Sequence, residues 1–532
     1  MRLVSVTIHE AEACGNLLNG LSLNLERPGD DDVRGALSTL CLVGPNGSGK
    51  SQFLQTITEI FQDAWHTCAP DEERAAPNKD LTFELVYDLV DSNGKARRVR
   101  LSRLRARKRA TDVRMEHQEA GNWVEIEPLS HSYRESLPPV IVGYTSGDNE
   151  TLSLPFFKSR AAYAKEVSSA ALDSERRTRD IPDNRLLLID YGTNLEVLIA
   201  NLMLGEEELR VRMLEHAALA GIASWQCIIQ LQPATVTRTK PINGRRGVKL
   251  TEELETILSK LRACSTCQSH DSRTDTYTLD FFVDEQTRTA FRDHWKDASQ
   301  LYRSFHKFAM LNDLAIPKKA RSRLAKQIKR GHFAARLPEP QDEHKVFRFE
   351  EVRFRASQAG DAPVDYVALS DGEHQQAQIF GVFSMITEPN ALFLLDEPES
   401  HFNPRWRVEF IKRLTSIPLS KVTPREVILT SHAPFVPSDM RREQVIKFRR
   451  TGTGSIEARN PVNETFGTSF DRILKDCFEV EPPISQMARD EIRGLSARAD
   501  VNEIEKALPT IGSSVEKAFL VDKLEQLKAG EE

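Results

Sequence analysis

The spacing of apolar and polar positions changes twice along the chain. Residues 81–90, 97–103 and 112–117 alternate apolar and polar side chains, which predicts an antiparallel meander near the N-terminus. Between about 206 and 345 the apolar spacing becomes helical and the sequence is rich in charge, with one strand-rich interlude around 277–283. The order of these patterns predicts an α/β protein with an inserted, mainly helical domain.

Four short, predominantly apolar runs predict further strands, at 36–43, 140–144, 391–395 and 427–430. The third run ends in two acids, as expected for a buried parallel strand whose carboxyl end carries the chemistry of an α/β sheet. Between these runs, residues 158–185 are polar and predict a mobile loop.

Weaker patterns fill the remaining segments. The apolar run 186–189 is followed by helical spacing through 195–202, and a second helix-like stretch covers 376–385. Strand character is expected again at 347–354 and 366–368.

The segment Gly44–Ser51, GPNGSGKS, fits the phosphate-binding pattern G-x-x-x-x-G-K-[ST] at every required position. It follows an apolar strand-like run and precedes a helix-like stretch, which is the context that the pattern requires. Backbone N–H groups and the helix N-terminus would hold the phosphates, Lys50 would reach the β- and γ-phosphates, and Ser51 would ligate Mg²⁺. The residues expected to bind nucleotide here are Asn46, Gly47, Ser48, Gly49, Lys50 and Ser51.

The apolar run before Asp396 and Glu397 predicts the second part of a nucleotide site. Asp396 would hold the Mg²⁺ shell, and Glu397 would polarise the attacking water. The next apolar run ends in Ser431 and His432, so His432 is expected on the neighbouring strand, near the γ-phosphate. The alternative interpretation is a strand that ends in a solvated acidic turn, followed by a structural histidine.

The sequence LSDGE at 369–373 precedes a helix-like stretch. A Ser-x-x-Glu turn before a helix is by itself a common cap, with Ser370 at the N-cap and Glu373 at the third position.

The ordered set GPNGSGKS, LSDGE, LFLLDEPE and TSH resembles the ABC-type ATPases. Within them it is similar to the branch with SMC proteins, DNA-repair ATPases and overcoming-lysogenization-defect (OLD) nucleases. The resemblance covers about 1–155 and 345–450. It implies a P-loop NTPase head with a mixed central sheet and an antiparallel β subdomain, and ATP and Mg²⁺ as cofactors.

The resemblance also implies a head-to-head homodimer. Ser370, Gly372 and Glu373 would then cap the γ-phosphate bound by the other copy, and the loop Glu399–Asn403 would communicate between subunits. The family has a glutamine loop after an early strand, but this chain has no glutamine there. Gly143–Glu150 fills its place, with Asn149 as the suggested substitute.

These patterns divide the chain into four predicted parts: an N-terminal ATPase lobe (1–157), an inserted mainly helical domain (158–345), a C-terminal ATPase lobe (346–460) and a helical tail (461–532).

Composition limits the remaining choices. The 532 residues carry a net charge of −6, so binding to nucleic acid would need local basic patches. Seven scattered cysteines and the absence of a signal-peptide pattern or a long apolar run predict a cytoplasmic protein without membrane spans. Cys264, Cys267 and His270 look like half a zinc site, with a polar loop as the alternative.

Two basic runs could contact phosphates. Lys318–Arg330 contains no acid, and on a helix it would form a cationic surface, a solvated face or a site for an acidic partner protein. Arg97–Arg109 could form a DNA-facing rim or an exposed sheet face.

No HNH, PD-(D/E)xK or Toprim pattern indicates a nuclease within the chain. With no nuclease pattern, no membrane segment and an OLD-like acidic strand, the chain resembles the ATPase subunit of antiphage systems of the Septu or PARIS type. That resemblance implies that it controls a separate nuclease or toxin effector. The alternatives are a DNA-repair or recombination ATPase that acts directly on DNA, and a non-enzymatic scaffold with a slow nucleotide switch.

Overall fold

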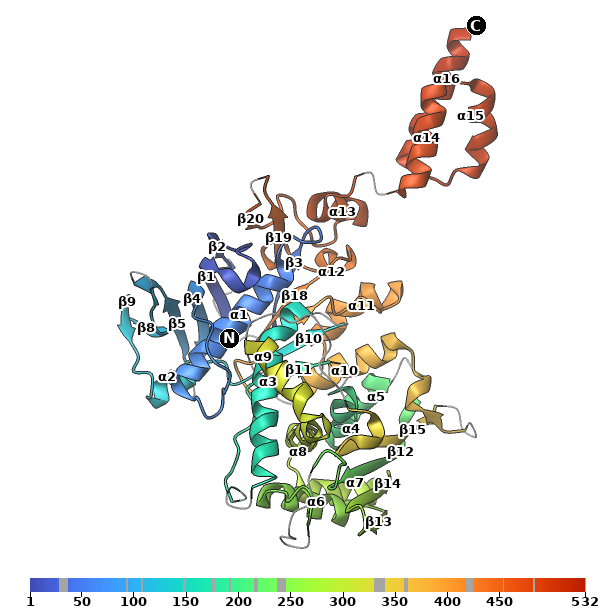
Figure 1. Cartoon of the computed structure of the whole chain (residues 1–532). Coiled ribbons are helices and arrows are strands. Elements are labelled where there is room, and N and C mark those ends of the chain that lie inside the picture. Colours follow the sequence, from blue (N-terminus) through green and yellow to red (C-terminus); the bar gives the residue numbers. More distant parts are fainter. Residues whose placement is uncertain are drawn as a thin grey trace. The chain divides into compact units, whose positions relative to one another are not determined.

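The computed structural model describes most of the chain: residues 1–27, 37–91, 94–106, 109–146, 150–173, 176, 178–190, 193–214, 219–236, 245–329, 340–357, 362–417, 424–452, 454–481 and 484–531. It divides into two compact units, 1–466 and 467–532 (Figure 1).

The centre of the larger unit is a sheet that, in the described residues, has seven strands in the order β11-β10-β17-β18-β3-β19-β20. All neighbouring strands are parallel except β20, which is antiparallel to β19. The strands are β3 (Leu37–Val43), β10 (Ile141–Thr145), β11 (Leu186–Ile189), β17 (Leu392–Asp396), β18 (Arg425–Thr430), β19 (Val445–Arg450) and β20 (Ile456–Arg459).

A second sheet is antiparallel throughout and has the order β2-β1-β4-β5-β8-β9 among the described residues. Its register places Arg98 opposite Asp88 and Arg100 opposite Glu116. The strands are β1 (Arg2–Ala11), β2 (Leu21–Asn24), β4 (Leu81–Val90), β5 (Ala96–Arg103), β8 (Arg114–Glu119) and β9 (Asn122–Glu125), and a small hairpin joins β6 (Arg105–Ala106) and β7 (Arg109–Ala110).

Helix α1 (Lys50–Cys68) lies in the core shared by these two sheets. Its apolar side chains, including Phe53, Ile57 and Phe61, belong to one buried cluster with residues of both sheets. A buried ion pair adds a polar link, because Arg27 lies 2.7 Å from Glu426 on β18, whose carboxylate also accepts a hydrogen bond from the backbone N–H of Leu3. The N-terminal sheet is therefore fixed to the strand that leads to His432.

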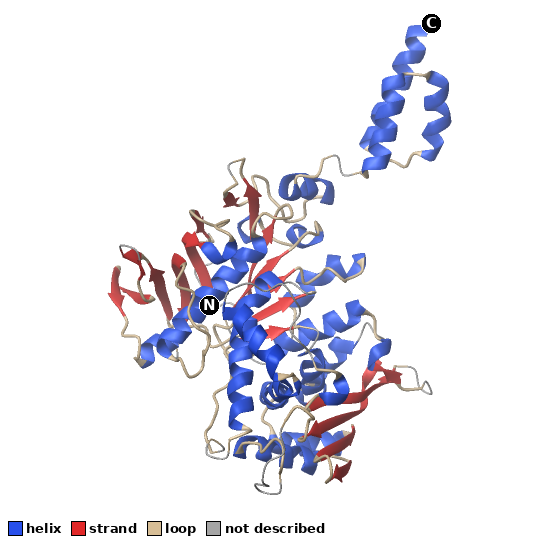
Figure 2. Cartoon of the chain, viewed as in Figure 1, coloured by secondary structure: helices blue, strands red, loops and turns tan. Residues whose placement is uncertain are grey.

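A third sheet lies in and beside the insert, with the order β13-β14-β12-β15-β16 in the described part of the chain (Figure 2). Trp225 stacks on Phe281 at 3.8 Å, and Phe291, Phe305 and Phe349 surround it. The sequence predicted a strand interlude around 277–283 and strand character at 347–354, which correspond to β14 and β15, but it did not predict the other three strands. The structure has β12 (Leu219–Gln230), β13 (Cys267–Asp271), β14 (Thr276–Phe282), β15 (Phe347–Ala356) and β16 (Val364–Asp365).

Two local predictions are wrong. The first half of the expected loop 158–185 belongs to helix α3 (Glu150–Ala170), which buries Phe156, Tyr163 and Val167. The expected strand at 366–368 is a short 3₁₀ helix instead, because Asp365 caps it by accepting a hydrogen bond from the backbone N–H of Val367.

The other helices of the larger unit have these bounds: α2 (His131–Glu135), α4 (Asn194–Leu204), α5 (Glu207–Leu214), α6 (Glu252–Cys264), α7 (Glu285–His294), α8 (Ala298–Met310), α9 (Lys318–Lys329), α10 (Asp371–Met385), α11 (Pro404–Thr415) and α12 (Phe435–Ser438). The smaller unit contains α13 (Phe470–Phe478), α14 (Gln486–Arg498), α15 (Val501–Ala507) and α16 (Val515–Glu531), with a core of Ile492, Leu495, Ile504, Leu520 and Leu524.

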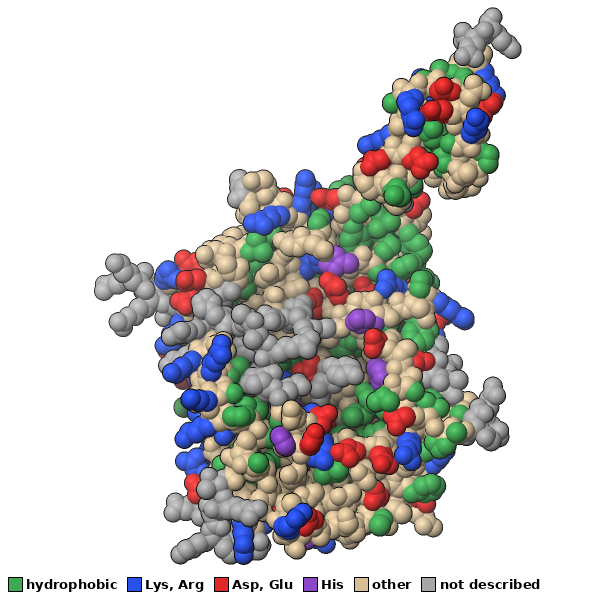
Figure 3. Space-filling model, turned by 45° about the vertical axis from the view of Figure 1, so that its right-hand side comes forward, with side chains coloured by type: hydrophobic (Ala, Val, Ile, Leu, Met, Phe, Trp, Pro, Cys, Tyr) green, Lys and Arg blue, Asp and Glu red, His purple; other side chains and the backbone are tan. Residues whose placement is uncertain are grey.

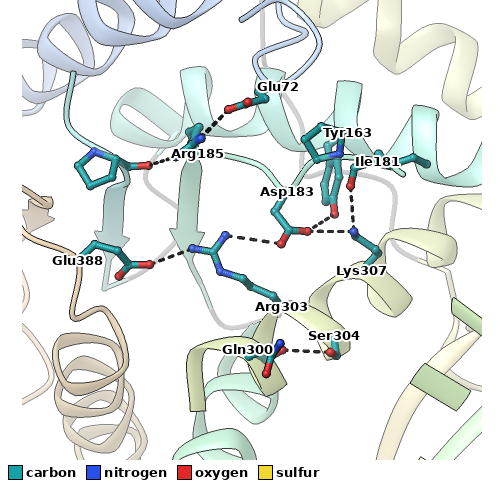
Figure 4. A network of polar contacts seen from close by, with 12 residues as sticks. Glu72, Tyr163, Ile181, Asp183, Arg185, Gln300, Arg303, Ser304, Lys307 and Glu388 are labelled. Atoms are coloured by element: carbon teal, nitrogen blue, oxygen red, sulfur yellow. Dashed lines mark hydrogen bonds and ion pairs between the residues drawn. The ribbon is translucent and has the colours of Figure 1, made fainter. Parts of the chain in front are cut away.

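A polar network fastens α8 of the insert to the central sheet (Figure 4). Asp183, just before β11, lies 3.2 Å from Lys307 and 3.6 Å from Arg303, and it accepts a hydrogen bond from the hydroxyl of Tyr163. Arg303 also reaches Glu388, in the segment that leads to β17, at 3.2 Å. The insert is thus tied to the strand that ends in Asp396.

The predicted α/β fold class, a P-loop type of central sheet with an antiparallel β subdomain and a largely helical insert, is confirmed by these sheets. The four-part division of the chain stays a prediction.

Candidate functional site

The phosphate loop (Gly44–Ser51) joins β3 to α1, as its sequence context predicted. Gly44 has φ +135°, and a Cβ atom there would come within 2.2 Å of the carbonyl oxygen of Phe448, so only glycine fits. Gly47 and Gly49 also have positive φ, of +73° and +92°. The hydroxyl of Ser48 is buried and has no hydrogen-bond partner in the described part of the chain. The loop thus has the positive-φ glycine backbone of a phosphate cradle and a buried polar atom left for a ligand.

Lys50 begins α1 and is 5% exposed. Its ammonium group donates hydrogen bonds to the carbonyl oxygens of Gly44 at 3.0 Å and Pro45 at 3.2 Å. Burial lowers the pKa of Lys50 to about 8, although the charges of Glu397 and Asp396 oppose this shift. Lys50 therefore lies over the loop and within the field of both acids.

Asp396 stands at the end of β17 and is 2% exposed. Its Oδ1 atom accepts hydrogen bonds from the hydroxyls of Ser51 at 3.0 Å and Thr430 at 2.6 Å. Burial raises the pKa of Asp396, and these two hydrogen bonds oppose the shift. Ser51 and Asp396, predicted as the metal-binding pair, lie together, and hydroxyl and carboxylate oxygens suit Mg²⁺ that is shared with phosphates.

Glu397 and His432 come from neighbouring parallel strands, since β17 pairs with β18. Nε2 of His432 lies 3.2 Å from Oε1 of Glu397, and both side chains are partly exposed. The hydrogen bond and charge of His432 lower the pKa of Glu397 despite partial burial, which keeps the carboxylate ionised at neutral pH. Glu397 has φ +48°, a strained backbone for a residue other than glycine, and such strain is common at functional sites.

The signature turn (Ser370–Glu373) opens α10 and forms a capping box. The carboxylate of Glu373 accepts hydrogen bonds from the backbone N–H and the hydroxyl of Ser370, both at 2.8 Å. Ser370 is exposed. Among the described residues, no hydrogen bond or ion pair joins this turn to the phosphate loop.

Gly372 packs against the loop Glu399–Asn403 of its own chain. A Cβ atom at Gly372 would come within 3.0 Å of the carbonyl oxygen of His401 and 3.3 Å of the Trp406 ring. The His401 ring in turn contacts the carbonyl oxygen of Ser146, after β10, at 2.9 Å. The loop that was predicted to communicate between subunits therefore lies directly beneath the signature turn.

Some sequence predictions fall outside the described residues. Asn149, the suggested substitute for the family's glutamine, is one of them, as are Arg107 and Lys108 in the first basic run and Arg330 in the second.

Sequence reasoning missed three side chains that organise the site: Thr430, Ser431 and Glu399. Thr430 bridges the two acids, because its hydroxyl donates to Asp396 and accepts from the backbone N–H of Glu397 at 3.0 Å. The buried Glu399 carboxylate accepts a hydrogen bond from the hydroxyl of Ser431 at 2.5 Å. Serine and threonine at a strand end carry no distinctive signal, and Glu399 stood out only as part of a loop.

The expected half zinc site has its polar groups engaged in other ways. Cys264 is buried at the end of α6, whereas Cys267 is exposed on β13. The His270 ring stacks on Tyr277 and lies 3.0 Å from Asp275. In the described part of the chain, no group of three or more His, Cys, Asp or Glu side chains could hold a metal ion.

None of the described helices is both long enough and apolar enough to cross a bilayer.

Residues 269–439 match a family model described as "AAA domain, putative AbiEii toxin, Type IV TA system". This range contains the signature turn, Asp396, Glu397 and His432, but not the phosphate loop. No curated protein matches the chain. The family match, together with the phosphate loop and the acidic strand, supports a P-loop ATPase in general terms.

Two solved structures also show similarity. The SMC head domain from Thermotoga maritima is 12% identical, with 86% of this chain and 99% of that chain covered and a TM-score of 0.30. A structure of SmcHead bound to the C-winged helix domain of ScpA is 11% identical, with 86% and 98% covered and a TM-score of 0.28. At such low TM-scores the likeness adds nothing to the functional argument.

Proposed function

We propose that the protein binds ATP with Mg²⁺ and hydrolyses it to ADP and phosphate. The observation that carries this proposal is the convergence of Lys50, Ser51, Asp396, Glu397 and His432 at the ends of three neighbouring parallel strands, where α/β sheets bind ligands.

Each group has a role in phosphoryl transfer to water, which requires positioning and charge neutralisation more than covalent chemistry. Lys50 and the backbone N–H groups of the phosphate loop hold the phosphates. Ser51 and Asp396 hold Mg²⁺, which supplies positive charge against the phosphate oxygens. The ionised Glu397 accepts a hydrogen bond from the attacking water, and His432 orients the carboxylate from the other side.

The proposed active form is a homodimer in which the signature turn of one copy caps the γ-phosphate bound by the other. Ser370 is exposed and at the start of a helix, where a partner's phosphate could approach its hydroxyl and the N–H groups of α10. Among the described residues, its polar groups bond Glu373 of the same turn and the His374 N–H of the same helix, so a partner's phosphate could reach the turn without breaking a contact to another part of the chain.

We assign this ATPase to antiphage defence, as a cytoplasmic subunit whose ATP-driven dimer controls a separate nuclease or toxin. The description of the matched family, which names a putative AbiEii toxin and a Type IV TA system, is compatible with this role. Copurification from the native operon tests it, and recovery without any nuclease or toxin subunit would count against it.

ATP turnover and light scattering test the ATPase itself. We expect Glu397→Gln to lower kcat by ~10²–10⁴-fold and to accumulate as a dimer in ATP, because it binds but does not activate water. Lys50→Ala should neither turn over ATP nor dimerise. Glu409→Gln is the matched control, since Glu409 lies on α11 and pairs with Arg413. Wild-type turnover by Glu397→Gln would refute the assigned role.

The second candidate function, a repair or recombination ATPase that acts on DNA, is favoured by helix α9. Its side chains Lys318, Lys319, Arg323 and Lys326 are exposed, and no ion pair is seen for them in the described residues. Arg321 is different, because it lies 3.1 Å from Asp313. Four available cations on one helix could neutralise backbone phosphates.

The other basic run does not offer the same charge, so we retain only α9 as a phosphate-binding surface. Arg98 pairs with Asp88 at 2.8 Å, Arg100 with Glu116 at 2.7 Å, and the buried Arg103 with Asp63 at 2.5 Å. On the face shown in Figure 3, Lys and Arg side chains gather along the left edge of the larger unit.

Duplex binding measured against salt concentration tests this candidate. Changing Lys318, Lys319, Arg323 and Lys326 to glutamate should abolish binding in low salt and flatten the salt dependence, because each phosphate contact contributes about one unit of slope. The control is Arg98→Gln with Arg100→Gln, which should leave binding unchanged. If the α9 variant binds DNA as the wild type does, the helix is only a solvated face.

A further inference from the structure

Glu399 is a buried carboxyl group next to the proposed catalytic pair, yet it would touch neither nucleotide nor metal. It follows Glu397 by two positions and is 3% exposed. Burying a carboxyl group costs free energy unless it makes compensating contacts, so its presence calls for an explanation.

The contact that Glu399 makes is with the residue before His432. Its Oε1 atom accepts a hydrogen bond from the hydroxyl of Ser431, and Ser431 is fully buried. The same hydroxyl accepts a hydrogen bond from the backbone N–H of Ala433 at 3.0 Å. Glu399 therefore fixes a short turn whose middle residue is His432.

This contact is not needed to join the two strands. β17 and β18 already pair in register from Leu392 to Leu395, and Thr430 links the strand ends through Asp396 and Glu397. Glu399 instead orients the residues just beyond the end of β18, and His432 is one of them.

The other side of Glu399 faces a polar region between β10 and α10. Within the described ranges its Oε2 atom has no hydrogen-bond partner. Burial raises the pKa of Tyr144 on β10, and the nearby negative charge of Glu399 adds to this shift. The side chain of Gln375 on α10 lies close to Tyr144 and opposes the shift. The amide of Gln375 nevertheless makes no hydrogen bond of good geometry to any residue that the structure describes. Burial also raises the pKa of Glu399 to about 7, with the Ser431 hydrogen bond opposing the shift.

We infer that Glu399 is a positioning residue, which holds His432 against Glu397 through Ser431 and so sets the rate of hydrolysis without contacting ATP. This inference rests on the proposed ATPase function. It predicts that the acceptor oxygen of residue 399 matters, and that its negative charge does not.

Steady-state ATP turnover by Glu399→Ala, Glu399→Gln and Ser431→Ala tests the inference. We expect Glu399→Ala and Ser431→Ala each to lower kcat by ~10–100-fold with KM nearly unchanged, because a small misplacement of a catalytic group slows the chemical step. Glu399→Gln should restore most of the rate, since its amide oxygen can accept the same hydrogen bond. The double variant should be no slower than either single one, because both remove one interaction.

Different results separate failure of the inference from failure of the proposed function. If the wild-type protein has no ATPase activity, or Glu397→Gln retains it, the function itself is wrong. If those controls behave as expected but Ser431→Ala and Glu399→Ala keep kcat within about twofold of the wild type, Glu399 does not position His432. A folded Glu399→Gln variant as slow as Glu399→Ala also overturns the inference. Should Glu399→Ala fail to fold, Ser431→Ala decides alone.

Discussion

The phosphate-loop side of the site and the signature turn differ in how their polar groups are bonded. On the phosphate-loop side, hydrogen bonds run between segments far apart in sequence: Ser51 to Asp396, and Thr430 to both Asp396 and Glu397. In the signature turn, Ser370 and Glu373 bond only each other and their own helix among the residues that the structure describes.

This difference teaches which part of the site a single chain can complete. The phosphate-loop side is largely buried and fixed by three strands, so it is formed whenever the chain folds. The signature turn is stable as a helix cap but Ser370 is exposed, and among the described residues no hydrogen bond or ion pair joins the turn to its own phosphate loop. We therefore expect substitutions on the phosphate-loop side to affect the monomer and the dimer alike. Substitutions in the signature turn should act mainly through a second copy of the chain.

Mixing two inactive variants gives the largest effect that this comparison predicts. Lys50→Ala and Ser370→Arg alone should each lose ~100-fold or more of ATP turnover, because each removes or blocks a contact to the phosphates. Mixed in equal amounts, they should recover activity, to at most about half of the wild-type rate, since each mixed dimer has one intact site out of two.

The control for this mixture is Lys50→Ala combined with the Lys50→Ala/Ser370→Arg double variant, which holds no intact phosphate loop and should stay inactive. If the first mixture also stays inactive although light scattering shows mixed dimers, the turn does not complete the partner's site, and the comparison fails.

Thr430→Val should give a smaller effect, which lies within one chain. Valine has the shape of threonine but leaves the backbone N–H of Glu397 unpaired and removes a donor to Asp396. We expect a loss of ~1–3 kcal/mol in the free energy of unfolding, measured by urea denaturation, together with a slower kcat. Thr39→Val is the matched control, because Thr39 is buried on β3 and accepts a hydrogen bond from Gln444. It should lower stability but not kcat; equal kcat losses would show that Thr430 has no special role.

The sequence predicted the position of the main site residues because their signals are local. The phosphate loop between a strand and a helix, and acids at the end of an apolar run, follow from short motifs and from the rule that parallel strands end at one edge. His432 could be placed beside Glu397 because β17 and β18 are adjacent in both sequence order and sheet.

The features that the sequence did not predict depend on distant partners. Strand β12 is held by β15, more than a hundred residues later, and by the stack of Trp225 on Phe281. The cations of Arg98 and Arg100 looked available in sequence, but Asp88 and Glu116 lie opposite them on neighbouring strands. The Glu399–Ser431 hydrogen bond likewise joins residues that no spacing rule connects.

The smallest predicted effect concerns Glu373. Glu373→Ala removes the carboxylate that caps Ser370, so the isolated chain should lose only ~0.5–1 kcal/mol of stability and should bind nucleotide as before. ATP-dependent dimerisation, measured by light scattering in the Glu397→Gln background, should weaken, because the turn no longer holds its shape for the partner's phosphate. Asp284→Ala is the control, since Asp284 caps α7 in the insert by accepting a hydrogen bond from the Thr287 N–H at 2.8 Å. That variant should lose similar stability and dimerise normally. If Glu373→Ala instead lowers the nucleotide affinity of the monomer, the turn serves its own chain, and the two sides of the site do not divide between copies.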